Sequence, residues 1–182
     1  KDPLAASATY VRFNRPEAML ACIILKSKNL GLNVIVTNHH NNRILNKDWK
    51  DKTWESRKID FLQQSNTIME SLQEWNSFVL YEILNEPNGD PYGSPPTLLN
   101  NNEWNEVLKH FFDGRKGSTS LTFVIGGSDW NSIHALEELE VPADANGGNI
   151  ILTVHYYDPP CFTQAYEKRF SSECLDPLKV QE

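Results

Sequence analysis

Four short segments of the chain are almost continuously apolar and end in polar residues. They are LNVIVTNHH (32–40), FVLYEILNEP (78–87), LTFVIGGSDW (121–130) and NIILTVHYYDP (149–159). Strands of a parallel sheet are buried on both faces and therefore form continuous apolar runs instead of alternating ones. We predict that these four segments are parallel strands. The segment ATYVRFNR (8–15) could be one more.

The segments between the strands show the pattern of helices. Residues 16–32 begin with a proline suited to a first helical turn and reach Gly31, a typical C-terminal stop. Residues 101–117 and 131–139 are two further predicted helices. Residues 53–75 place their apolar side chains on one stripe, at Ile59, Phe61, Leu62, Ile68, Met69, Leu72 and Trp75. Helices that alternate with strands indicate a parallel sheet with crossover helices.

The predicted strands begin at about residues 32, 78, 121 and 149. Spacing this wide favours an α/β fold of the (β/α)8 TIM-barrel type over a small doubly wound sheet. A complete barrel needs about 250 residues, and the chain has 182. We therefore expect one partial barrel domain over residues 1–182, with about four or five of the eight βα units. Such a domain would expose two sheet edges and the inner face of the barrel.

Composition narrows the possible partners. A net charge of −7 leaves no basic surface to meet phosphates, which argues against a nucleic-acid partner. No apolar run reaches the 18 residues that a membrane span needs. The first residues, KDPLAAS, lack the apolar core of a signal peptide, so a secretory leader, if one exists, has been removed or is not included. A neutral ligand such as a sugar remains compatible with this composition.

Cysteine usage adds two expectations. Cys22 lies in an apolar segment and is expected to be a small core residue. Cys161 and Cys174 share one loop-like stretch and could be bridged, which would suit an exported protein.

Every predicted strand ends in polar or aromatic residues: His39-His40, Asn85-Glu86, Ser128-Asp129-Trp130 and His155-Tyr156-Tyr157. The C-terminal ends of parallel strands point to one face of an α/β protein, where such folds build their sites. Glu86 could be an ordinary surface residue of a turn, but an apolar run delivers it to this face. A carboxyl group partly withdrawn from water favours its protonated form, which a general acid requires. We therefore predict an active site around Glu86.

These motifs occur in the order of a known enzyme family. YEILNEP, with VIVTNHH before it and VHYYDP after it, resembles glycoside hydrolase family 5, the cellulase and endoglucanase family. VIGGSDWNSIHALEELEVP is similar to that family's fifth-strand region, and the similarity covers roughly residues 17–163. The resemblance implies a (β/α)8 barrel, present here from about strand two or three to strand six. It also implies cleavage of β-glycosidic bonds with retention and no cofactor.

The resemblance implies roles for the residues around the scissile bond. Glu86 matches the general acid/base, and Asn85 matches the residue that binds the adjacent sugar hydroxyl. Tyr157 matches a tyrosine near the nucleophile. Arg12, in YVRFNR, is similar to the family's second-strand arginine, which supports the nucleophile.

Four further residues match positions that bind substrate. His39 and His40 correspond to the pair that lines a subsite at the end of the third strand, and His155 to the sixth-strand histidine. Trp130 resembles an aromatic platform on which a sugar ring can stack.

A retaining mechanism needs a second carboxyl group about 5–5.5 Å from the first, as nucleophile. The family places it at the end of the seventh strand, after the His-Tyr-Tyr motif. Glu167, Glu173 and Glu182 follow that motif here, but none comes after an apolar strand or a glycine. We expect the nucleophile to be missing from this partial sequence, which alone should not hydrolyse a polysaccharide efficiently.

The forms of the His-His and His-Tyr-Tyr-Asp-Pro motifs are more similar to the endoglucanase branch. They imply an endo-β-1,4-glucanase acting on β-glucan polysaccharides or oligosaccharides. A polymer outside the cell needs an exported enzyme, so we expect the protein to be secreted, and we expect it to be monomeric when complete. The alternatives are another family activity such as mannanase, a non-catalytic carbohydrate-binding barrel, an α/β domain with accidental motifs, and a metal-dependent hydrolase. The last would use His39, His40, His155 and Glu86 as ligands. Adjacent strand residues point to opposite faces, so His39 and His40 form a poor chelating pair, and we expect no metal.

Overall fold

The computed structural model of the chain describes residues 16–39, 42–45, 52–90, 97–115, 120–142 and 149–157. Its elements, in chain order, are α1 (Pro16–Asn29), β1 (Val34–Thr37), α2 (Asn42–Leu45), α3 (Trp54–Leu72), η2 (Gln73–Trp75), β2 (Val79–Glu82), β3 (Gly89–Asp90), β4 (Thr97–Leu98), α4 (Asn101–Gly114), β5 (Thr122–Ile125), α5 (Ser128–Asn131), η3 (His134–Leu136) and β6 (Ile150–Leu152). None of the described helices combines the length and the apolar composition that crossing a bilayer requires.

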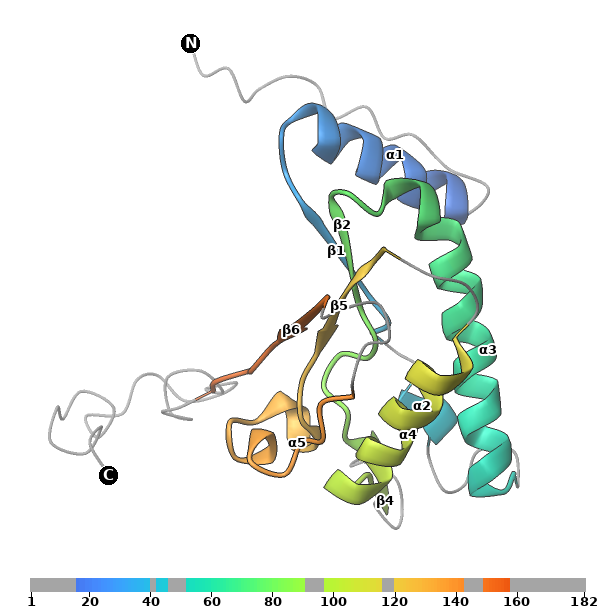
Figure 1. Cartoon of the computed structure of the whole chain (residues 1–182), viewed down its shortest axis with the longest axis vertical. Helices are drawn as coiled ribbons and strands as arrows, with labels where there is room; N and C mark the ends of the chain where they lie inside the picture. Colours follow the sequence, from blue (N-terminus) through green and yellow to red (C-terminus); the bar gives the residue numbers. More distant parts are fainter. Residues whose placement is uncertain are drawn as a thin grey trace, which may run out of the picture.

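The sheet confirms the four predicted strands. β1, β2, β5 and β6 pair in that order, and every pairing is parallel. Figure 1 shows the four strands side by side, with α3 and α4 together on one side of them. The fold is therefore a partial (β/α)8 barrel, as predicted. The candidate strand at 8–15 lies outside the described residues.

Aromatic side chains define the face of the sheet that the helices cover. The rings of Tyr81 on β2 and Phe123 on β5 lie 6.4 Å apart, centroid to centroid. Phe123 in turn contacts Phe111 and Phe112 of α4, at centroid distances of 5.6 and 5.3 Å. All four side chains are buried, so the hydrophobic core lies between the sheet and its helices.

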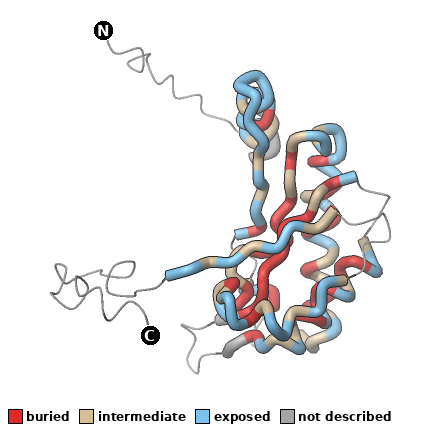
Figure 2. Tube along the Cα trace, turned by 60° about the vertical axis from the view of Figure 1, so that its left-hand side comes forward, coloured by how far each residue is buried: buried red, intermediate tan, exposed pale blue. Residues whose placement is uncertain are grey.

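The opposite face of the sheet is less covered. On the outer strands, Val36 and Ile150 pack against the core, whereas their neighbours Ile35 and Ile151 are 58% and 46% exposed. Successive strand residues point to opposite faces, so the exposed pair marks the face that is the interior of a closed barrel. Figure 2 shows the contrast between buried central strands and exposed outer ones. The expectation of an exposed inner face is confirmed at the outer strands, whereas Glu82 and Val124 on the same face of the central strands are only 8% and 5% exposed.

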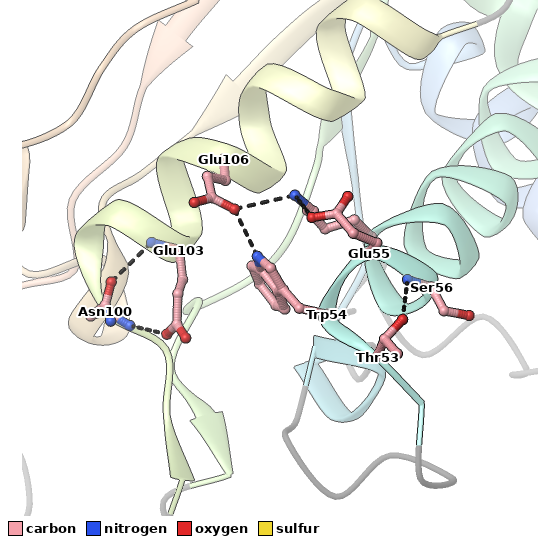
Figure 3. Close-up of polar contacts among 8 residues, drawn as sticks. Thr53, Trp54, Glu55, Ser56, Asn100, Glu103 and Glu106 are labelled. Carbon is pink, nitrogen blue, oxygen red and sulfur yellow. Dashed lines mark hydrogen bonds and ion pairs between the residues drawn. The ribbon is translucent and has the colours of Figure 1, made fainter.

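Polar contacts fasten α3 to α4 (Figure 3). The indole N–H of Trp54 donates to Glu106 Oε2 at 2.7 Å, and Lys58 Nζ lies 3.2 Å from the same oxygen. The Trp54 hydrogen bond and then Lys58 hold the pKa of Glu106 below its usual range. At the start of α4, the side chain of Asn100 accepts from the backbone N–H of Glu103, and the Glu103 carboxylate accepts from that of Asn100. This capping box fixes the first turn of α4.

Two predictions about helices need correction. Cys22 of α1 is exposed instead of buried, whereas Ile24 is only 1% exposed. Residues two positions apart point about 200° apart around a helix, so only one of them can face the sheet. In α3, Ile59 is the exposed member of the predicted apolar stripe. Cys161 and Cys174 lie outside the described residues.

The segment after β5 also differs from the prediction. The strand predicted over 121–130 ends at Ile125, and the helix predicted over 131–139 is reduced to the 3-10 turn η3. Between them, Asp129, Trp130 and Asn131 all have left-handed backbone, with φ of 53°, 57° and 57°. Left-handed residues end both strand and helix geometry, because neither can continue through a positive φ.

Candidate active site

Backbone hydrogen bonds connect the segments that follow the C-terminal ends of the strands, and we call this end of the sheet the site edge. The N–H of Asn85 donates to the carbonyl of Asn38, which links the chain after β2 to the end of β1. The N–H of His155 donates to the carbonyl of Asn131 at 2.9 Å, which links the chain after β6 to the turn after β5. The predicted convergence of strand ends is therefore present for these segments.

The side chain of Glu86 lies at the site edge and contacts two residues that follow β6. Its side chain is 22% exposed, and its Oε1 lies 2.7 Å from Nδ1 of His155. The hydroxyl of Tyr157 donates to the same Oε1 at 2.5 Å. The two rings contact each other edge to face, with centroids 6.2 Å apart. Glu86 follows β2, whereas His155 and Tyr157 follow β6 and lie 69 and 71 positions later in the chain, so two distant segments form one hydrogen-bonded group.

This arrangement makes the two carboxyl oxygens of Glu86 chemically different. The Tyr157 hydroxyl donates to Oε1, and Nδ1 of His155 lies 2.7 Å from the same oxygen. When the carboxyl group is protonated and Nδ1 of His155 is a donor, the carboxyl proton is best held on Oε2, because Oε1 then faces two donors. The group can then donate a proton from Oε2 and later recover one there, which is the task of a general acid/base.

The backbone around Glu86 is held in an unusual conformation. Glu86 has a φ of 48° although a proline follows it, a position where extended backbone is favoured. The side-chain Nδ2 of Asn42 donates to the carbonyls of both Asn85 and Glu86, at 3.2 Å each, and its Oδ1 accepts from the N–H of Asn88. Asn42 therefore clamps the turn that carries the carboxyl group. No pattern in the sequence points to it, because α2 has only four residues.

The structure gives the exposure of two other predicted site residues, His39 and Asn85, and does not describe two more. His39 is exposed and directly follows the buried Asn38 at the end of β1. Asn85 is half-buried beside Glu86. His40 and Arg12 lie outside the described residues. The roles of these side chains in substrate binding stay predictions.

Trp130 lies in the left-handed turn and lines a cavity of about 370 Å³. Asn88, Ser128 and His134 line the same cavity. The indole is half-buried, so part of its surface is available for contact. Its role as a sugar platform stays a prediction. Within the described ranges, no three His, Cys, Asp or Glu side chains are grouped as a metal site requires.

A profile of the cellulase family (glycosyl hydrolase family 5) matches residues 17–180. The chain belongs to glycosyl hydrolase family 5. The resemblance seen in the motifs is thereby confirmed, and the partial barrel is the fold expected of a family 5 segment.

Individual relatives agree with this family. Endoglucanase H of Acetivibrio thermocellus is 27% identical over 143 residues, which are 79% of this chain and 14% of that protein. The crystal structure of endoglucanase Cel5A from Thermotoga maritima is 30% identical with a TM-score of 0.64, over 92% of this chain and 50% of Cel5A. PbGH5A, a family 5 enzyme from Prevotella bryantii, shares the fold at 21% identity and a TM-score of 0.63, over 90% of this chain and 50% of its own. The chain thus spans about half the length of these solved family 5 structures.

Proposed function

We propose that the protein is an endo-β-1,4-glucanase that cleaves β-glucans by a retaining double displacement, with Glu86 as the general acid/base. The observation that carries the proposal is the carboxyl group of Glu86 at the strand ends, with His155 and Tyr157 both bonded to Oε1. Membership of family 5 and the endoglucanase relatives support it.

Glu86 acts in both halves of the reaction. In the first, its proton moves from Oε2 to the glycosidic oxygen while a nucleophilic carboxylate attacks the anomeric carbon, and the leaving sugar departs as an alcohol. In the second, the Glu86 carboxylate takes a proton from water, whose oxygen displaces the nucleophile and restores both carboxyl groups. The proposal places the nucleophile outside residues 1–182, in agreement with the span of the chain relative to solved family 5 structures.

The substrate side of the proposal rests on the predicted binding residues. Asn85 would bind the sugar hydroxyl beside the scissile bond, His39 and His40 would line a subsite, and Trp130 would stack on a sugar ring. Solved structures of Thermotoga maritima Cel5A contain cellobiose in one case and mannotriose in another. Both β-glucan and β-mannan therefore belong in a substrate test. A secreted, monomeric enzyme is part of the proposal, because a polymer outside the cell requires an exported catalyst.

The test is the Glu86→Gln variant of the full-length protein. Loss of acid assistance should lower the rate on β-glucan polymer by about 10²–10⁴-fold. Aryl glycosides with good leaving groups need little protonation, so their glycosyl-enzyme should still form and then turn over slowly. Glu106→Gln is the matched control, since it makes the same chemical change at an exposed carboxylate on α4. Its activity should stay close to wild type.

Two results would contradict the proposal. Polymer hydrolysis near the wild-type rate in Glu86→Gln would remove Glu86 from the acid/base role. Tight binding of cello-oligosaccharides without turnover by the wild-type full-length protein would favour a carbohydrate-binding barrel.

A further inference from the structure

The chain leaves the sheet after β5, and Asn131 is the residue at which it again forms a backbone hydrogen bond with the segment that follows β6. Thr153 donates its N–H to the carbonyl of Ile125, as the parallel register requires, but the next donor, His155, reaches the carbonyl of Asn131 at 2.9 Å. The residues between Ile125 and Asn131 leave the sheet and come back through a left-handed run. Asn is among the residues that tolerate this conformation best after glycine, so Asn131 suits the end of the run.

The side chain of Asn131 is fully buried and points at the histidine that contacts Glu86. Asn131 is 0% exposed, and its Nδ2 lies 3.5 Å from Nε2 of His155. Its Oδ1 is buried without a hydrogen-bond partner among the described residues. A Cβ on Gly126 would collide with this amide, so the glycine leaves the room that the Asn131 side chain occupies. The His155 ring is therefore held between Glu86 and Asn131.

We propose that Asn131 is a positioning residue that selects the neutral tautomer of His155 with its proton on Nδ1. An ionised carboxylate oxygen can only accept, so Nδ1, at 2.7 Å from Glu86 Oε1, must carry a proton to bond it. In the neutral ring Nε2 is then an acceptor, and the Asn131 amide offers it the matching donor. In the opposite tautomer, the Nε2–H of His155 would face an N–H of the Asn131 amide, and no hydrogen bond could form.

This selection has a consequence for catalysis, which rests on the proposed role of Glu86. In the opposite tautomer, Nδ1 would be an acceptor and could draw the carboxyl proton of Glu86 onto Oε1, away from the glycosidic oxygen. With Nδ1 fixed as a donor, Oε1 receives hydrogen bonds from His155 and Tyr157, and the proton stays on Oε2. Asn131 thus keeps the acid ready for transfer without contacting the substrate.

The direct test is the tautomer itself, read from the ¹⁵N shifts of His155 in the full-length protein at neutral pH. In the wild type, Nδ1 should show the shift of a protonated nitrogen and Nε2 that of an acceptor. Asn131→Asp offers only acceptor oxygens, so Nε2 should become protonated. Asn131→Gly keeps the left-handed backbone without the amide and should give a mixture of tautomers. Asn105→Asp changes another buried amide, which bonds Glu138 and Glu140, and should leave His155 unchanged.

The activity of the same variants separates this inference from the proposed function. Asn131→Asp should slow cleavage of substrates with poor leaving groups at least tenfold and affect those with good leaving groups less. Protonated Nε2 in the wild type, or identical His155 shifts in the wild type and Asn131→Asp, would overturn the inference whatever the activity. A changed tautomer together with full activity of Glu86→Gln would instead refute the proposed function and leave the selection by Asn131 standing.

Discussion

The indole of Trp104 links the core of the barrel to the turn that carries Trp130 and Asn131. Trp104 is fully buried in α4, and its Nε1–H donates to the carbonyl of Gly126 at 2.8 Å. Gly126 is the first residue after β5 and packs against the Asn131 amide. The substitution Trp104→Phe removes this donor while keeping an aromatic ring in the core.

The expected destabilisation follows from two effects. The buried carbonyl of Gly126 loses its partner, which costs about 1–3 kcal/mol. The smaller ring leaves a space of about 30 Å³, roughly one water, which adds about 0.7 kcal/mol at 24 cal/mol per Å³. We therefore expect Trp104→Phe to lower the free energy of unfolding by about 2–4 kcal/mol.

Urea denaturation of the full-length protein, followed by circular dichroism, measures this change. Trp54→Phe is the matched control, because the Trp54 indole is only half-buried and donates to the exposed carboxylate of Glu106. That variant should lose less than about 1 kcal/mol. If the two variants were equally destabilised, or if Trp104→Phe lost less than about 1 kcal/mol, the buried hydrogen bond to Gly126 would not have the importance assigned to it.

Three further predictions concern capping, the Glu86 turn and alkaline pH. Asn100→Ala should lower the free energy of unfolding by about 1 kcal/mol, because α4 loses its capping box. Asn100→Asp keeps an oxygen acceptor at this position and should stay near the wild-type value. Equal stabilities of the two variants in urea would contradict this prediction. Asn42→Ala should reduce kcat/KM on β-glucan about tenfold, because the Glu86 turn loses its clamp; unchanged kinetics would show that the turn holds without it. Burial raises the pKa of Tyr81 to about 12, while the unfolded phenol titrates near 10. The folded state thus keeps the phenol proton to higher pH than the unfolded state does. The free energy of unfolding should be unaffected by this group below about pH 10 and should fall by up to about 2.7 kcal/mol as the pH rises through 12. Tyr81→Phe should flatten this slope in urea titrations, and parallel slopes for both proteins would count against burial as the cause.

Much of the architecture could be predicted from local patterns. The four apolar runs became β1, β2, β5 and β6, because a strand buried on both faces must be apolar throughout. Helix periodicity and the glycine after α1 likewise depend only on near neighbours in the chain, and Gly31 adopts the expected left-handed φ of 71°. The wrong predictions concern the segment after β5 and the burial of Cys22. Hydrophobic periodicity reveals neither the three left-handed residues after β5 nor which side of α1 is exposed.

The sequence by itself determined that polar residues follow each buried strand and that their order is that of family 5. This much is set by residue type and spacing along the chain. Only the tertiary structure decided that His155 and Tyr157 share one oxygen of Glu86, that Asn42 clamps the turn, and that Asn131 faces the far side of the histidine ring. Those contacts join segments that are distant in the chain, and β2 and β6 are separated in the sheet by β5. Their geometry depends on register and on a backbone reversal, which the packing of the whole sheet specifies and no short segment can.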